Sequence, residues 1–122
     1  MIPSRIALIL FGILLSTMVR AQPPGGADAL LSGGQLLQHC MGTQKWDQAA
    51  CYYYAVGLAD MANLATALGG SIGGARVCLP QGIALFAMHD SIVRYLKAHP
   101  KELRQGAPGL AMVALAKAFR CP

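Results

Sequence analysis

The chain of 122 residues has little charge and few aromatic side chains. Only 12% of its residues are charged, and Asp and Glu together number five. No two acidic residues lie three or four positions apart, so no helix face holds the carboxylate pair that general acid–base catalysis uses. Ser71 and Ser91 have no catalytic motif around them, and His89, two positions from Ser91, would diverge from it on a helix. The sequence therefore predicts a protein that is not an enzyme.

Motifs for binding phosphates, nucleic acids and metals are also missing. The glycine-rich stretch at residues 69–77 lacks both the Gly-Lys-Ser/Thr ending and the preceding strand of a phosphate loop, so we interpret it as a flexible connector. No basic run is interleaved with aromatic residues, which argues against nucleic-acid binding. There is no Cys-x-x-Cys, and the adjacent His39 and Cys40 would point in different directions on a helix. We therefore expect no metal and no cofactor.

The N-terminal residues have the pattern of a secretory signal peptide. Arg5 precedes an apolar run of fourteen residues, 6–19, and Val19 and Ala21 occupy positions −3 and −1 of a cleavage site before Gln22. A membrane anchor is the alternative, but the run is shorter than the roughly 20 residues that span a bilayer. We expect a signal peptide at 1–21, a flexible Pro/Gly leader at 22–28, and one helical domain at 29–122 that has no membrane contact after cleavage.

All four cysteines follow the predicted cleavage site. An even number of cysteines in a small exported domain predicts two disulfides, which a chain of this size needs because its core is small. The sequence alone leaves three pairings open. The four residues are Cys40, Cys51, Cys78 and Cys121.

Four segments have helical periodicity, and no segment favours a strand. The expected helices cover about residues 29–41, 47–68, 80–99 and 108–119, with Asp47 as the N-cap of the second. The last segment is apolar nearly all round, which is typical of a central helix or of one covered by a partner, such as a second copy in a homodimer. We predict an all-α fold, a small disulfide-stapled bundle of four main helices. The expected buried stripes are Cys51, Tyr54, Leu58, Met61 and Ala65 on the second helix and Leu85, Met88, Ile92, Tyr95 and Leu96 on the third.

The third helix has distinct start and stop signals. Pro80 suits its beginning and Pro100 ends it. Asp90 and Arg94 are spaced for an i,i+4 ion pair, and His99 lies near the C-terminus, where a cation or a capping group is favoured.

The helix order favours one disulfide pairing over the other two. Short connections make neighbouring helices antiparallel, so the start of the third helix and the end of the fourth lie at the same end of a hairpin. Cys78 can then pair with Cys121, which leaves Cys40 to pair with Cys51. This pairing most simply meets the limit of about 7 Å between the two Cα atoms of a disulfide.

An ordered series of short motifs resembles the Rap/Tai family of small exported immunity proteins. The series is LLQHC at 36–40, Cys51-x-x-Tyr54-x-x-Gly57-x-x-Asp60, CLP at 78–80, YLKAHP at 95–100 and ALAKAFRC at 114–121. The resemblance covers nearly all of residues 36–121. It implies a helical, disulfide-stapled periplasmic protein of Gram-negative bacteria that binds and neutralises a type VI secretion effector, notably a peptidoglycan amidase. Dimers are known in the family.

Some positions match the family's framework and others depart from it. The departures are Tyr52-Tyr53 after the second cysteine, Phe86-Ala87 early in the third helix, and Arg120. Gly57 in mid-helix suggests that another helix approaches closely. Asp60 is either solvated or bound to a neighbouring helix start, Arg76 or Arg94. The framework positions are Tyr54, Gly57, Asp60, His99 and Pro100.

Loop exposure and the departure at Phe86 suggest where a partner binds. The candidate surface combines the glycine-rich loop with the outer face of the third helix. We expect the protein to inhibit the effector by binding it. The alternative is that it is a structural or chaperone-like periplasmic helical protein without a toxin partner. The candidate interface residues are Ile72, Arg76, Phe86, Asp90 and Arg94.

Overall fold

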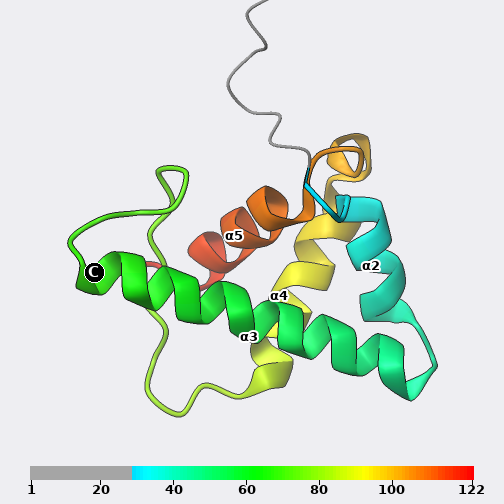
Figure 1. Cartoon of the computed structure of the whole chain (residues 1–122), viewed down its shortest axis with the longest axis horizontal. Coiled ribbons are helices and arrows are strands. Elements are labelled where there is room, and N and C mark those ends of the chain that lie inside the picture. Colours follow the sequence, from blue (N-terminus) through cyan, green and yellow to red (C-terminus); the bar gives the residue numbers. More distant parts are fainter. Residues whose placement is uncertain (1–28) are drawn as a thin grey trace, which may run out of the picture.

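The computed structural model describes residues 29–122, which form an all-α bundle, as predicted (Figure 1). Its elements are α2 (Gly33–Met41), α3 (Lys45–Ala67), α4 (Leu85–Ala98), the short 3-10 helix η1 (Pro100–Glu102) and α5 (Ala107–Ala118). In Figure 1, the long helix α3 crosses in front of α4, with α5 above it and α2 above its right-hand end. The predicted signal peptide and leader lie outside the described residues. Within residues 29–122, no helix combines the length and the apolar character needed to cross a bilayer.

Helix α2 begins later than the sequence predicted. Ser32 is its N-cap: the Ser32 side chain accepts a hydrogen bond from the Gln35 N–H at 3.2 Å, and the Ser32 N–H donates to Gln35 Oε1 at 2.9 Å. This reciprocal capping box satisfies two N–H groups at the helix start. Gly33 and Gly34 therefore lie in the first turn of α2, and Gly33 is buried against the Leu110 side chain, where a Cβ would collide.

Helix α3 packs inward through small side chains. Its buried face is Cys51, Ala55, Ala59 and Ala62, so the predicted stripe is one position off for most of its length. Met61, which we expected to be buried, is 54% exposed. Alanines on the inner face let the helix lie close to its neighbours, and the larger apolar residues are displaced to the flanks and the outside.

The start of α3 also differs from the prediction. Gln44, and not Asp47, occupies the N-cap position, and its side chain makes no capping bond. Asp47 lies in the first turn, where its carboxylate is 2.9 Å from Nδ1 of His39 on α2. The acidic side chain thus joins two helices while also lying near the positive end of the α3 dipole.

Helix α4 starts at Leu85, five residues after the predicted position at Pro80. The segment before it contains a turn at Gly82, which has φ +72°, a conformation that favours glycine. Leu85 is therefore 47% exposed, in contrast to the prediction, while Met88, Ile92 and Leu96 are buried as predicted.

Helix α5 is the central helix. Its buried residues face α2, α3 and α4, so the bundle itself covers most of its apolar surface. A second copy is not needed to cover it, although Val113 is 37% exposed. The buried residues are Ala107, Leu110, Ala111, Met112, Ala114 and Leu115.

Both disulfides have the expected pairing. Cys40 is bonded to Cys51 and Cys78 to Cys121, each with a Cα–Cα distance of 4.9 Å. In the chain-entropy model, closing loops of these lengths contributes about 3 and about 4 kcal/mol to stability. The second disulfide also holds the segment before α4 to the end of α5, where the Cys78 N–H donates to the Phe119 carbonyl at 3.0 Å.

The capping box gives a direct stability test. Ser32→Ala removes the side chain that accepts the Gln35 N–H bond, so we expect the free energy of unfolding to fall by about 1 kcal/mol. Urea denaturation followed by circular dichroism measures this change. Gln38→Ala on the exposed side of α2 is the matched control and should change stability by less than about 0.5 kcal/mol. Equal effects of the two substitutions would show that the cap contributes nothing.

Candidate partner-binding surfaces

A groove of about 490 Å³ opens between the second half of α3 and the start of α5. Leu58 and Met61 of α3 form one wall, and Leu110, Met112 and Val113 of α5 form another. Largely apolar walls with a few polar groups are typical of a site that binds a ligand or a partner side chain. The remaining lining residues are Ile72, Gly73, Ala75, Tyr95, Glu102, Gln105, Pro108 and Gly109.

The glycine-rich segment after α3 folds into a tight turn beside this groove. Ile72 and Ala75 exchange two backbone hydrogen bonds of 3.2 and 2.9 Å, and Gly73 and Gly74 between them have φ +57° and +77°. Positive φ at both central residues is the geometry of a type I′ turn, which glycine adopts without strain. Figure 1 shows this loop leaving the C-terminal end of α3 and projecting above that half of the helix. The segment interpreted as a connector is thus a defined turn, with Ile72 half-buried in the groove wall.

The polar end of the groove is built around Tyr95. Its hydroxyl donates to the Glu102 carboxylate at 3.2 Å; burial, and then the charge and hydrogen bond of Glu102, raise the pKa of Tyr95 above its usual value. The His99 ring stacks on the Tyr95 ring at 4.0 Å, and Lys117 Nζ lies 5.0 Å from the same ring's centre. These contacts fix the orientation of the Tyr95 ring, which lines the groove.

His99 caps α4, which agrees with its predicted place at the helix end. It is the C-cap residue, and its Nδ1–H donates to the Tyr95 carbonyl at 2.7 Å. Pro100 then begins η1. This pair of residues turns the chain from α4 toward Glu102 and so positions the polar end of the groove.

The outer face of α4 is a second exposed surface. Phe86, Asp90 and Arg94 lie four positions apart on one exposed stripe, and Phe86 is 64% exposed. The predicted Asp90–Arg94 ion pair is not among the ion pairs within residues 29–122; the Asp90 carboxylate instead lies 3.8 Å from His89 Nδ1. The Arg94 guanidinium is therefore available to a partner.

The five candidate interface residues do not form one continuous patch. Ile72 lines the groove and Arg76 is exposed just after the turn, whereas the other three lie on α4. In Figure 1, the turn after α3 and the beginning of α4 lie well apart, on opposite sides of α3. The two parts are thus separate surfaces.

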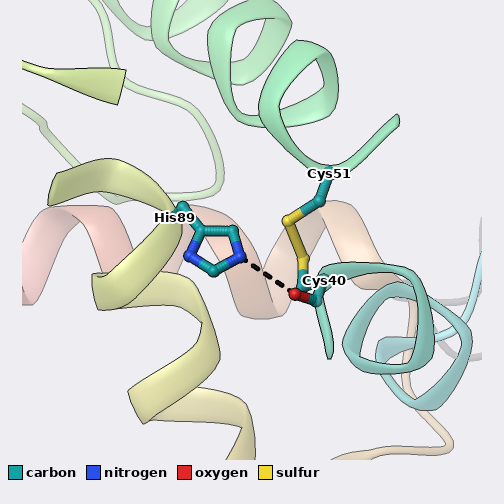
Figure 2. Close-up of side chains that lie close together, drawn as sticks. All are labelled: Cys40, Cys51 and His89. Atoms are coloured by element: carbon teal, nitrogen blue, oxygen red, sulfur yellow. Dashed lines mark hydrogen bonds between the residues drawn. A yellow bond between two sulfur atoms is a disulfide. The ribbon is translucent and has the colours of Figure 1, made fainter. Parts of the chain in front are cut away.

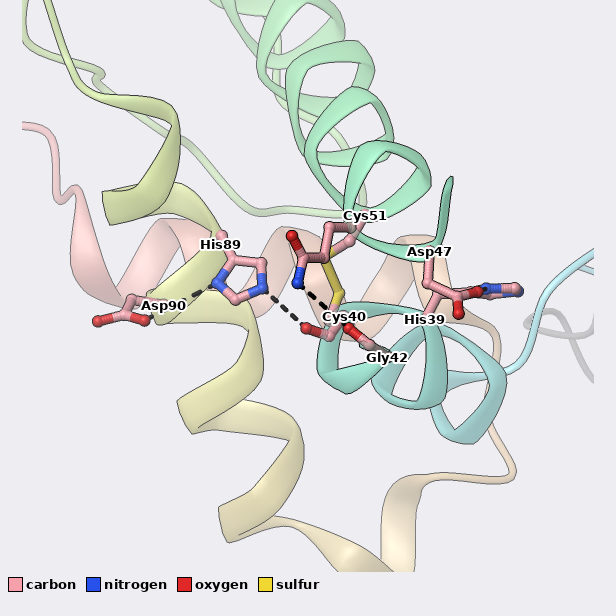
Figure 3. The surroundings of a disulfide bond; sticks show 8 residues. His39, Cys40, Gly42, Asp47, Cys51, His89 and Asp90 are labelled. Atoms are coloured by element: carbon pink, nitrogen blue, oxygen red, sulfur yellow. Dashed lines mark hydrogen bonds and ion pairs between the residues drawn. A yellow bond between two sulfur atoms is a disulfide. The ribbon is translucent and has the colours of Figure 1, made fainter. Parts of the chain in front are cut away.

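Two histidines form hydrogen bonds beside the buried disulfide. Figure 2 shows His89 reaching from α4 to the end of α2, where its Nε2–H donates to the Cys40 carbonyl at 3.0 Å. Figure 3 shows Asp90 on the other side of that ring and His39 beside Asp47. Ligand atoms of Cys40, Cys51 and His89 lie within 4.8 Å of one another, but the two sulfur atoms are joined to each other and are not thiolates that could bind a metal.

A hydroxyl group and an imidazole group on α4 form hydrogen bonds with backbone carbonyls. Ser91 Oγ donates to the Ala87 carbonyl of its own helix at 2.7 Å, and His89 is bonded to Cys40. Activation of a serine requires a base within hydrogen-bonding reach of its hydroxyl. The pairing of Ser91 with His89 that such chemistry needs is therefore not formed.

Two framework positions on α3 face outward. Gly57 is exposed, and a Cβ added there would meet nothing within 4 Å, so no helix of this bundle approaches it as we had expected. Asp60 is also exposed and takes no part in the ion pairs found within residues 29–122. Of the two alternatives for Asp60, the structure favours the solvated one.

Tyr54 is the framework residue with an unusual environment. It packs against the core, and its hydroxyl is buried without a hydrogen-bond partner among the described residues. This burial raises the pKa of Tyr54.

Sequence reasoning missed much of the groove and the exposed face of α3. The groove is lined by residues from separate elements, including Gln105, Pro108 and Gly109 before and within the start of α5. A sequence pattern within one segment cannot predict a site of this kind. The outer face of α3 was detectable in the sequence, because its large apolar residues recur at steps of three and four, as the buried alanines do.

One family model matches the chain. It describes the Rap1a immunity proteins and matches residues 32–121, well over half of the chain. Neither a curated protein nor a solved structure matches it.

The buried hydroxyl of Tyr54 gives a testable prediction. Tyr54→Phe removes an unpaired polar group, so the free energy of unfolding at pH 7 should stay equal or rise by about 1 kcal/mol. The folded-state pKa of Tyr54 is raised, so wild-type stability is lost as the pH rises above about 10 and through that pKa, and the variant should lose less.

Urea denaturation at pH 7 and at alkaline pH measures both effects. Tyr53→Phe, at a side chain that is 76% exposed, is the matched control and should behave as the wild type. A clear loss of stability for Tyr54→Phe at pH 7 would mean that the hydroxyl makes a stabilising hydrogen bond.

Proposed function

Because the chain belongs to the Rap1a immunity protein family, we propose that it binds a type VI secretion effector and blocks it in the periplasm. The effector is proposed to be a peptidoglycan amidase, whose activity would otherwise damage the wall of the producing cell. Export by the N-terminal signal peptide would place the protein in the compartment where such an effector acts.

The observation that carries this proposal is the extent of the family match. Residues 32–121 include every helix from α2 to α5 and all four cysteines, so the match concerns the whole described fold and not a local motif. Two disulfides also suit an oxidising compartment such as the periplasm.

We propose that the protein acts by binding and not by catalysis. The hydroxyl and imidazole groups that a hydrolase would need are held by backbone carbonyls, as described for Ser91 and His89. An inhibitor instead needs a rigid, exposed surface, because a preorganised surface loses less conformational entropy when it binds. The disulfide-held bundle supplies such a surface.

The turn at residues 72–75 and the outer stripe of α4 are the proposed contacts with the effector. The turn projects and is narrow, so it can enter a cleft, while the groove beside it can receive a side chain of the effector. Arg76 after the turn and Phe86 and Arg94 on α4 are exposed, and aromatic and arginine side chains often dominate interface energetics. The separation of the two surfaces means that a small effector could engage one without the other.

Inhibition of the neighbouring gene product tests the function. The full chain is expressed, the disulfide-bonded product is purified from the periplasm, and it is mixed with the protein encoded by the adjacent gene. We expect a stable complex and complete loss of amidase activity on peptidoglycan fragments at equal stoichiometry. A neighbour without amidase activity, or no complex at micromolar concentration, would contradict the proposal and favour a structural or chaperone-like role.

Paired substitutions test the proposed contacts. Arg76→Ala combined with Phe86→Ala should weaken effector binding at least about tenfold, because each truncation removes an exposed anchor. Isothermal titration calorimetry measures the affinity. Arg104→Ala with Met41→Ala removes an arginine and a large apolar side chain from exposed positions elsewhere and should leave the affinity unchanged. Full affinity in the first variant would exclude these two residues from the interface.

A further inference from the structure

The groove between α3 and α5 has the size and the lining of a site for a small molecule. Its volume of about 490 Å³ lies within the range of about 300–1,000 Å³ that is usual for such sites. Leu110 and Met112 contribute buried side chains to the lining, whereas Met61 is 54% and Val113 is 37% exposed. A ligand in the groove would remove apolar surface of Met61 and Val113 from water, which favours a ligand with an apolar body.

A glycine in the lining keeps part of the groove open. Gly109 lies in the first turn of α5, where glycine is a poor helix former. It does not have a positive φ, and a Cβ added to it would meet nothing within 4 Å. Neither the backbone nor the packing of the chain therefore requires glycine at this position. The space beside it is free for a ligand.

Glu102 is the single charged residue of the groove lining, and its charge is not balanced by a cation of the chain. Its half-buried side chain accepts a hydrogen bond from the Tyr95 hydroxyl through Oε2, while Oε1 has no hydrogen-bond partner in the described part of the chain. Neither ion pair found within residues 29–122 includes Glu102. Lys117 Nζ lies over the Tyr95 ring, 5.0 Å from its centre, and is not paired with this carboxylate. A partly buried carboxylate beside apolar walls favours a ligand that brings a positive charge.

We propose that the groove binds a small amphiphilic amine, a molecule with a primary ammonium group on a linear aliphatic chain. The aliphatic chain lies between Met61 of α3 and Val113 of α5. The ammonium group donates a hydrogen bond to Glu102 Oε1, and the Tyr95 hydroxyl continues to donate to Oε2. A hydrogen bond between an ammonium group and a carboxylate is about twice as strong as one between neutral groups, so the head group fixes the orientation of the ligand.

Other classes of ligand fit this lining less well. A fatty acid would place its carboxylate beside Glu102, where the two negative charges repel each other. A sugar or a nucleotide would lose the hydration of its polar groups against walls that cannot form hydrogen bonds with them. The charge and the apolar lining therefore select the amine together.

This inference goes beyond inhibition of an effector and does not rest on it. The groove and the Glu102 carboxylate are features of the isolated chain, so an amine can bind whether or not an effector is present. An amine in the groove would compete with an effector side chain for the same space.

Titration with simple amphiphiles tests the proposal. The full chain is expressed with export to the periplasm, and the disulfide-bonded product is titrated with n-octylamine at pH 7 in a calorimeter. We expect one site with a Kd of about 0.1–1 mM. n-Hexylamine should bind about tenfold more weakly, because each buried CH₂ group strengthens binding about three- to fourfold. 1-Octanol and octanoate should each bind at least about tenfold more weakly than n-octylamine, because neither brings a positive charge to Glu102.

A blocked lysine, Nα-acetyl-lysine methylamide, separates a free amine from a side chain of a partner protein. It carries the same ammonium group on a shorter aliphatic stem, so we expect it to bind at least about tenfold more weakly than n-octylamine. Tighter binding of the blocked lysine would overturn the proposal and identify a protein side chain as the occupant.

Two variants locate the site. Glu102→Gln keeps an oxygen that can accept from the Tyr95 hydroxyl but removes the charge, so n-octylamine should bind at least about tenfold more weakly while 1-octanol binds as before. Gly109→Leu places a side chain in the open space of the groove and should weaken the binding of both compounds at least about tenfold. Asp90→Asn and Gly57→Leu are the matched controls, since both residues are exposed and lie outside the lining, and both should bind n-octylamine with the wild-type affinity.

Circular dichroism verifies that each variant is folded. The proposal would be overturned if the wild type did not bind n-octylamine at about 10 mM, or if it bound 1-octanol or octanoate equally well. It would also be overturned if folded Glu102→Gln or Gly109→Leu kept the wild-type affinity, or if the matched controls lost binding to the same extent.

Discussion

The bundle depends on the close packing of α3 through Ala55, Ala59 and Ala62. Because these side chains are small, the helix axis can lie near α2, α4 and α5, and protein interiors are packed too densely to admit larger groups there. A helix has a limited circumference, so the larger apolar residues between the alanines must lie on the flanks or outside. The same constraint that permits a compact core in a short chain therefore leaves Tyr53, Met61 and Leu64 exposed on the outer face of α3.

Covalent and hydrogen-bonded ties hold the remaining surfaces in place. Each disulfide joins the ends of two segments, and the His89 bond to the Cys40 carbonyl connects α4 to the end of α2. His99 and Pro100 direct the chain into η1 and so place Glu102 beside the groove. A surface fixed in this way binds with little loss of conformational entropy, which suits a member of an immunity protein family.

Patterns within single segments were sufficient to predict the all-α class, the buried residues Met88, Ile92 and Leu96 of α4 and the position of His99. The order of the helices was sufficient to predict the pairing of both disulfides. Predictions failed where local chemistry or long-range packing decided the outcome. A capping box at Ser32 and a positive φ at Gly82 moved the starts of α2 and α4. On α3, the size of the side chains decided which apolar stripe faces inward. Whether a side chain is small enough depends on helices that are distant in the sequence. The groove could not be predicted, because its lining comes from separate elements that only the folded chain brings together.

Protection of living cells tests most directly whether the protein neutralises an effector by binding it. The adjacent gene product is exported to the periplasm of a bacterial host, with or without the full chain of this protein. We expect the host to lyse when the effector is produced alone, and to grow normally when the protein is produced with it and the two are recovered as a complex. Lysis at the same rate in the presence of the folded protein would contradict inhibition by binding.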